Sequence, residues 1–139
     1  MKLSFRAVLL IAAALLMIFG AAGDTFVVLP DLHGDLVEIG VRPTVLGGTV
    51  LRLYFGALAM FGFALMVSAA AIQAIRGIAP ARLPLAIVAV IYTVFGVMAF
   101  SRSHNPHHLG PLLIGALLAA ALGIPRPRFA DLKVDADQG

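Results

Sequence analysis

Four long apolar runs, separated by polar connections, dominate the 139-residue chain. About 20 consecutive apolar residues in a helix are enough to cross the hydrocarbon of a bilayer. The pattern predicts transmembrane helices at about residues 5–22, 49–76, 82–101 and 106–124. Because short connections make consecutive helices antiparallel neighbours, we expect an all-α polytopic membrane protein, folded as an antiparallel four-transmembrane-helix bundle.

The first and last runs need the most interpretation. Lys2, Arg6 and the apolar run from Ala7 to Gly23 also fit a signal peptide, but we expect a retained helix. The run from Leu109 to Ile124 is short for a crossing, so we expect the fourth helix to begin at Asn105-Pro106, a favourable cap and first-turn pair. Gly77 is expected to stop the second helix.

Residues 24–48 form the one long polar connection. Pro30, Gly34, Gly40, Pro43 and the Gly47-Gly48 pair interrupt it, so long regular structure is not expected there. A short interfacial helix is the alternative, because Leu32, Leu36 and Ile39 would share one face of it.

Composition agrees with a lipid environment, since 61% of the residues are hydrophobic and 12% are charged. A soluble chain of this length cannot bury that much apolar surface. We expect one transmembrane domain over residues 1–125 and a polar cytoplasmic tail over 126–139. The formal charge is +3, but the basic residues are spread over the ends of apolar runs, which argues against nucleic acid as a partner. The absence of cysteine excludes thiolate chemistry and cysteine-ligated metals.

Basic residues are divided unequally between the two predicted sides. One side has seven, and the other has only Arg42, Arg52 and Arg102; the seven are Lys2, Arg6, Arg76, Arg82, Arg126, Arg128 and Lys133. Loops rich in lysine and arginine stay in the cytoplasm. We therefore predict a multi-pass protein of a bacterial inner membrane with both termini cytoplasmic.

Histidine and aspartate residues gather on the predicted outer side. Three histidines lie within five residues of one another, and a further histidine and two aspartates lie in the opposite polar connection. Neutral imidazole and carboxylate groups suit zinc, copper or nickel. A transition-metal site is therefore one hypothesis, against hydrated surface side chains as the alternative; its candidate ligands are Asp31, His33, Asp35, His104, His107 and His108.

Small residues recur every fourth position in the last helix, at Gly115, Ala119 and Gly123. Such spacing allows close helix packing, either inside the bundle or against a partner or second copy. Tyr92 could bind a quinone or lipid carbonyl, or hydrogen-bond to a neighbouring helix. Arg52 and Arg102 are further candidates for ligand binding, or for pairing with the outer carboxylates.

The second and third apolar runs, Leu53 to Ile75 and Leu83 to Phe100, contain no titratable side chain apart from Tyr54 and Tyr92. Proton-coupled transport needs such a group at membrane depth, so it is not expected. The segments Leu51-Arg52-Leu53-Tyr54-Phe55-Gly56 and Phe95-Gly96-Val97-Met98-Ala99-Phe100 resemble small DoxX-like integral membrane proteins. The resemblance implies a four-helix bundle and, for some members, an accessory role beside quinone-linked oxidoreductases.

The leading hypothesis is a non-catalytic accessory or assembly subunit of a larger inner-membrane complex. The partners would be membrane lipid and a protein subunit or a second copy, with no cofactor. A metal-handling or quinone-linked redox protein that uses the outer His/Asp cluster is the first alternative. A passive carrier of small solutes or lipids is the second.

Overall fold

The computed structural model describes residues 4–104 and 109–124, and the regular structure in these ranges is entirely helical. The elements in order are α1 (Phe5–Gly23), the π-helix η1 (Asp24–Val28), α2 (Leu29–Glu38), α3 (Pro43–Ile75), α4 (Arg82–Ser103) and α5 (Leu109–Gly123). The predicted all-α, four-helix membrane class is confirmed. Three helical stretches, Phe5–Glu38, Pro43–Ile75 and Arg82–Arg102, are long and apolar enough to cross a membrane.

The first helix does not end near residue 22. It continues through η1 and α2 as one stretch of 34 residues up to Glu38. The expectation of a largely irregular connection over 24–48 is therefore wrong, and the short helix proposed for Leu32 to Ile39 is the end of this longer one. Asp24 consequently lies within an uninterrupted helix and not in a loop.

Pro30 explains why the continuation includes a π-helix. A proline inside a helix lacks the backbone N–H, and its ring collides with the carbonyl four residues earlier. That carbonyl belongs to Phe26, which is inside η1. The wider turn of a π-helix moves the Phe26 carbonyl away from the Pro30 ring. The helix therefore continues past the proline instead of ending before it.

Glycine in the left-handed conformation follows the ends of two helices. Gly40, with φ +73°, and Gly77, with φ +76°, follow the ends of α2 and α3. The Val41 N–H donates to the Leu36 carbonyl and the Gly40 N–H to that of Val37, a pairing typical of helix C-termini. Gly77 was predicted as the stop of the second helix, and this is confirmed.

The start of α3 differs from the prediction. The helix begins at Pro43, six residues before the predicted start at Thr49. Proline in the first turn is a strong start signal, because its missing N–H would have no helical partner anyway. Gly47 and Gly48 are accommodated inside the helix. By contrast, α4 agrees with its prediction to within two residues at its C-terminal end.

Helix α5 has 15 described residues, which corresponds to a length of about 22 Å. Its predicted start at Pro106 lies outside the described residues.

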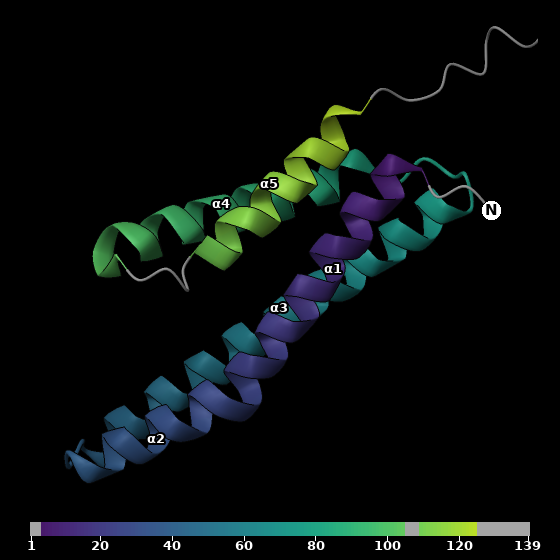
Figure 1. Ribbon diagram of the computed structural model, residues 1–139. Coiled ribbons are helices and arrows are strands. Elements are labelled where there is room, and N and C mark those ends of the chain that lie inside the picture. The colour runs from purple at the N-terminus through teal and green to yellow at the C-terminus, as the bar shows by residue number, and fades with distance from the viewer. Residues whose placement is uncertain (1–3, 105–108, 125–139) are drawn as a thin grey trace, which may run out of the picture.

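The helices form two antiparallel hairpins that diverge from each other (Figure 1). α1 packs along α3, and α4 packs along α5. The hairpins are joined mainly by α5 lying on α1, while α3 and α4 touch only over a short stretch. The end that holds the N-terminus of α1 also holds the C-termini of α3 and α5 and the start of α4.

Every helix of the two hairpins contributes to one apolar core. In α1 the buried positions are spaced alternately three and four residues apart, which is the seam of left-handed helix packing. Small side chains prevail, as expected where lipid gives no hydrophobic drive and close approach must hold the helices together. The buried members of this core are Leu10, Ala13, Ala14, Met17, Ala64, Val67, Ala70, Ala71, Leu85, Val88, Ala89, Tyr92, Ile114, Leu118 and Ala121.

Candidate functional site

Residues 24–56, which we call the arm, extend the α1–α3 hairpin away from the core. Within the arm only Leu29 is buried, and the core includes no arm residue. A helix of 34 residues is about 51 Å long, whereas the hydrocarbon of a bilayer is about 30 Å thick. Even at a tilt of about 40°, the helix spans about 39 Å along the bilayer normal. A spanning helix of this length therefore exceeds the thickness of the hydrocarbon even when it is tilted.

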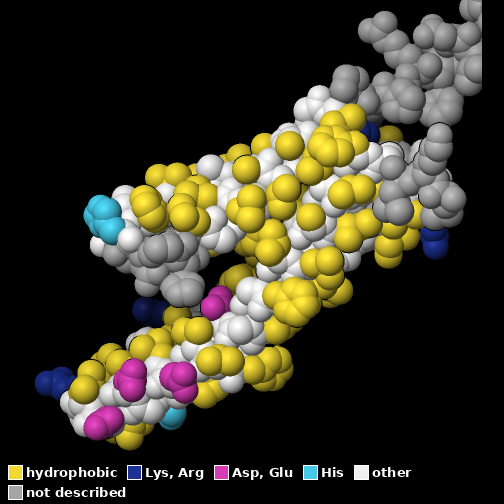
Figure 2. Space-filling model, viewed as in Figure 1, with side chains coloured by type: hydrophobic (Ala, Val, Ile, Leu, Met, Phe, Trp, Pro, Cys, Tyr) yellow, Lys and Arg dark blue, Asp and Glu magenta, His cyan; other side chains and the backbone are white. Residues whose placement is uncertain are grey.

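The arm has an acidic face. Asp31, Asp35 and Glu38 are spaced four and three residues apart, so they lie on one side of α2, and all are exposed. Figure 2 shows acidic side chains gathered over α2. Leu32 and Leu36 are partly buried on another side, as predicted. Ile39 was expected to join them, but it is 73% exposed.

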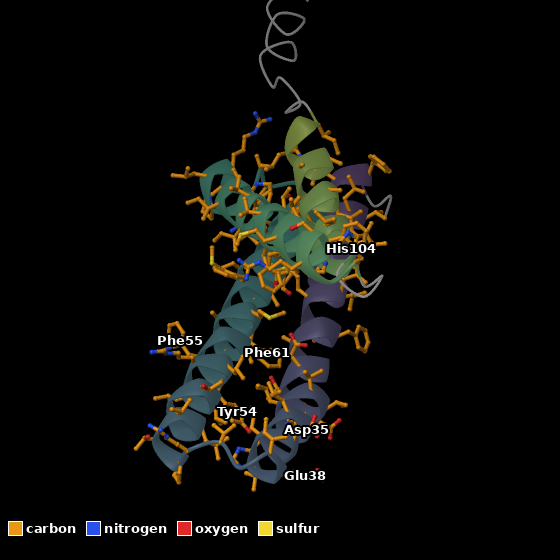
Figure 3. All side chains as sticks on the ribbon, turned by 90° about the vertical axis from the view of Figure 1, so that its left-hand side faces the viewer. Asp35, Glu38, Tyr54, Phe55, Phe61 and His104 are labelled. Carbon is orange, nitrogen blue, oxygen red and sulfur yellow. The ribbon has the colours of Figure 1, made fainter. Side chains whose placement is uncertain are left out.

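Apolar side chains of the arm are also exposed. Leu51 is 72% exposed and Phe55 is 73% exposed. Figure 3 shows Phe55 pointing outward from α3, away from the neighbouring helix, whereas Asp35 and Glu38 lie on α2. Two helices packed side by side cover only the faces that they turn towards each other. Their outer faces stay exposed unless a second layer packs on them. The arm therefore combines an acidic and an apolar surface that nothing in the described chain covers.

The predicted metal site is not assembled by the described residues. His33 is two positions from both Asp31 and Asp35, so it points to another side of α2. His104 lies at the end of α4, and Figure 3 shows it well away from Asp35. Residues 4–104 and 109–124 hold no group of three or more potential ligands. The remaining candidates, His107 and His108, lie outside the described residues.

His104 has a structural role at the end of α4. It adopts the left-handed conformation, with φ 51°. Its N–H donates to the Phe100 carbonyl at 2.9 Å, and its ring lies 6.1 Å from the Phe100 ring. The residue therefore ends the helix in the way that glycine ends α2 and α3.

Tyr92 is buried, with 4% of its surface exposed. Its ring makes an edge contact with Phe63 of α3, with centroids 6.5 Å apart. The expected hydrogen bond to a neighbouring helix is absent, because the hydroxyl has no partner among the described residues. The other two ligand-binding candidates, Arg52 and Arg102, are exposed on α3 and in the last turn of α4.

The predicted small-residue stripe is only partly used. Gly115 is buried against α4, and an added methyl group there would collide with the Thr93 hydroxyl. Ala119 is exposed, and Gly123 has open space around it. Gly96 makes the other close approach, against Leu112 of α5. Gly115 and Gly96 therefore serve packing inside the α4–α5 hairpin.

Arg6 joins the start of α1 to the end of α5, which the sequence alone does not reveal. Its side chain donates to the carbonyls of Ala121, at 3.2 Å, and Ile124. Arg82, at the start of α4, also donates to the Ile124 carbonyl, at 3.4 Å. These bonds satisfy carbonyls at the C-terminal end of α5, where the helix dipole favours positive charge.

Comparison with known proteins gives no match, whether with protein-family models, curated proteins or solved structures. The site is therefore interpreted from this chain's own residues. Its most distinctive feature is the arm, which exposes both an acidic and an apolar surface.

Proposed function

We propose that this protein is a non-catalytic accessory or assembly subunit of a larger membrane complex, and that the arm is its docking element. The supporting observation is the exposure of the arm's side chains. Over residues 24–56 a single residue is buried, while large apolar side chains and an acidic face are exposed. A partner subunit supplies the second layer that two helices alone lack.

The arm's length favours a protein partner over lipid alone. Lipid covers apolar side chains within the hydrocarbon, but the hairpin is longer than the hydrocarbon is thick. On the arm, Ile39 and Leu51 are exposed as well as Asp35 and Glu38, and a mixed surface of this kind suits a protein interface with an apolar centre and a polar rim.

For the membrane and orientation we propose a bacterial inner membrane with both termini in the cytoplasm. Arg6, Arg76 and Arg82 lie at the same end of the two hairpins, and the lysine- and arginine-rich side of a membrane protein stays cytoplasmic. The arm then lies on the outer side. A phosphatase or fluorescent reporter fused after Gly139 tests this, because activity on the outer side contradicts the proposed orientation.

Copurification tests the docking proposal. The full-length chain, purified in a mild detergent, is expected to carry a second protein in fixed stoichiometry. Leu51→Ser should release that protein, because Leu51 is on the arm. Leu83→Ser is the matched control, because Leu83 is also 72% exposed but does not belong to the arm. It lies at the start of α4, near the end of α3 that is far from the arm. Circular dichroism of each variant checks that the helices remain folded.

Three results would contradict the proposal. The first is a chain that purifies without any stoichiometric companion. The second is a companion that is only another copy of the chain, which would make the protein a homo-oligomer. The third is equal loss of the companion in the Leu51 and Leu83 variants.

A further inference from the structure

An apolar groove separates α3 from α4 near their connecting turn. Its volume is about 200 Å³. It exists because the two helices diverge from the turn and touch only over a short stretch (Figure 1). Its walls consist mostly of small or apolar side chains, namely Met66, Ala69, Ala70, Ala81, Pro84, Leu85 and Val88, with Gln73 as the one polar member.

One arginine continues the α3 wall of the groove towards the turn. Arg76 follows Gln73 by three residues, so the two share a helix face, and its side chain is exposed. Arg82 instead lines a smaller hollow beside α1 and α5 and donates to the Ile124 carbonyl. The groove therefore has an apolar lining, with one positive charge just beyond it at the turn.

The far end of the groove is limited by an aromatic contact. Phe63 lies three residues before Met66, and Tyr92 lies four residues after Val88, so both continue the helix faces that line the groove. Their rings meet edge-to-face across the two helices, with centroids 6.5 Å apart. The ring contact therefore fills the gap between α3 and α4 beyond the groove.

We propose that this groove binds part of one acyl chain of an anionic phospholipid, whose phosphate is held by Arg76. The groove lies between helices that are apolar enough to span a membrane, so lipid is the solvent at its opening. Basic side chains beside gaps between transmembrane helices recognise anionic headgroups. The volume is below the range of about 300–1,000 Å³ for sites that enclose a drug-sized ligand. It suits part of one acyl chain, while the rest of the lipid stays in the bilayer.

Native mass spectrometry of the purified full-length chain tests the site, with dioleoyl phosphatidylglycerol and dioleoyl phosphatidylcholine as probes. We expect one phosphatidylglycerol to bind more tightly than phosphatidylcholine. Arg76→Gln should weaken phosphatidylglycerol about fivefold, since one basic side chain near an anionic lipid contributes about that factor. Arg102→Gln is the control, because Arg102 is exposed at the opposite end of α4.

A second pair of variants tests whether the chain enters the groove. Ala69 lines the groove but is exposed, so Ala69→Phe fills the space without entering the core. It should abolish the tight binding step. Ala120→Phe is its control, because Ala120 is an exposed alanine on α5, away from the groove.

Each contrary result overturns a definite part of the proposal. Equal affinity for the two lipids refutes recognition of an anionic headgroup. Unchanged binding in Ala69→Phe means that the headgroup rests on the turn with no chain in the groove. Inorganic phosphate that competes as well as intact phosphatidylglycerol would make this a site for free anions.

Discussion

Replacing Gly115 with alanine tests the packing of the α4–α5 hairpin most directly. A methyl group at this position would collide with the Thr93 hydroxyl, and would lie 3.1 Å from the Thr93 nitrogen and 3.2 Å from the Ala89 oxygen. The hydroxyl cannot turn away freely, because it donates to the Ala89 carbonyl at 2.8 Å. Breaking that bond costs about 1 kcal/mol, and the two backbone contacts remain.

The expected magnitude follows from two opposed effects. Overpacking in a tight core destabilises by about 1–3 kcal/mol. Alanine in place of glycine inside a helix returns up to about 1 kcal/mol. Gly115→Ala should therefore lower the free energy of unfolding by about 1–2 kcal/mol. Gly123→Ala is the matched control, since it has the same change on the same helix but open space around the new methyl group.

Unfolding in mixed micelles with increasing sodium dodecyl sulfate, followed by far-ultraviolet circular dichroism, measures both variants. The double variant Gly115→Ala/Thr93→Ala should recover part of the loss, because it removes the nearest colliding atom. If Gly115→Ala and Gly123→Ala unfold alike, the close approach of α4 and α5 is refuted.

Three further variants examine other contacts in the same unfolding assay. Arg6→Ala should destabilise the protein by about 1–3 kcal/mol, because it leaves the Ala121 carbonyl without its arginine donor and the Ile124 carbonyl with only the bond from Arg82; an unchanged midpoint would exclude that role. Tyr92→Phe should raise stability by about 1 kcal/mol, because the buried hydroxyl has no partner among the described residues; a loss of stability would reveal a partner. Gly40→Ala should cost about 1 kcal/mol, because φ is +73° there, and a neutral result would contradict the left-handed turn.

Hydrophobic patterning was sufficient to predict the membrane class and the apolar part of each helix, but not where the first helix ends or where α3 begins. An apolar run reports its surroundings directly, because each residue of a span must tolerate lipid or another helix. The end of α3 was predictable for a local reason, since Gly77 can adopt the left-handed conformation that closes a helix. The same patterning placed α4 almost correctly.

The helical structure of the arm was not predicted, because its residues disfavour a helix locally while packing between helices favours one. Pro30 and Gly34 disfavour helix on their own, yet α2 packs along α3, and this contact sustains the helix. Pro30 alone does not reveal whether the helix ends before it or continues through a π-helix. The roles of Arg6 and Gly115 depend on neighbours far along the chain, in the case of Arg6 and Ala121 by 115 positions. The four-residue spacing of Gly115, Ala119 and Gly123 looks uniform, but of the two glycines only Gly115 lies against α4.

The two proposals concern opposite ends of α3, so their tests are independent. Leu51 on the arm and Gln73 in the groove are separated by 22 residues of one helix, or about 33 Å. Substitutions farther apart than about 10 Å, without shared neighbours, act additively. Loss of a partner protein in Leu51→Ser should therefore leave phosphatidylglycerol binding intact, and Arg76→Gln should leave the partner bound. If either substitution changes both properties, α3 must transmit a displacement along its length, and the arm would then respond to lipid at the far side of the membrane.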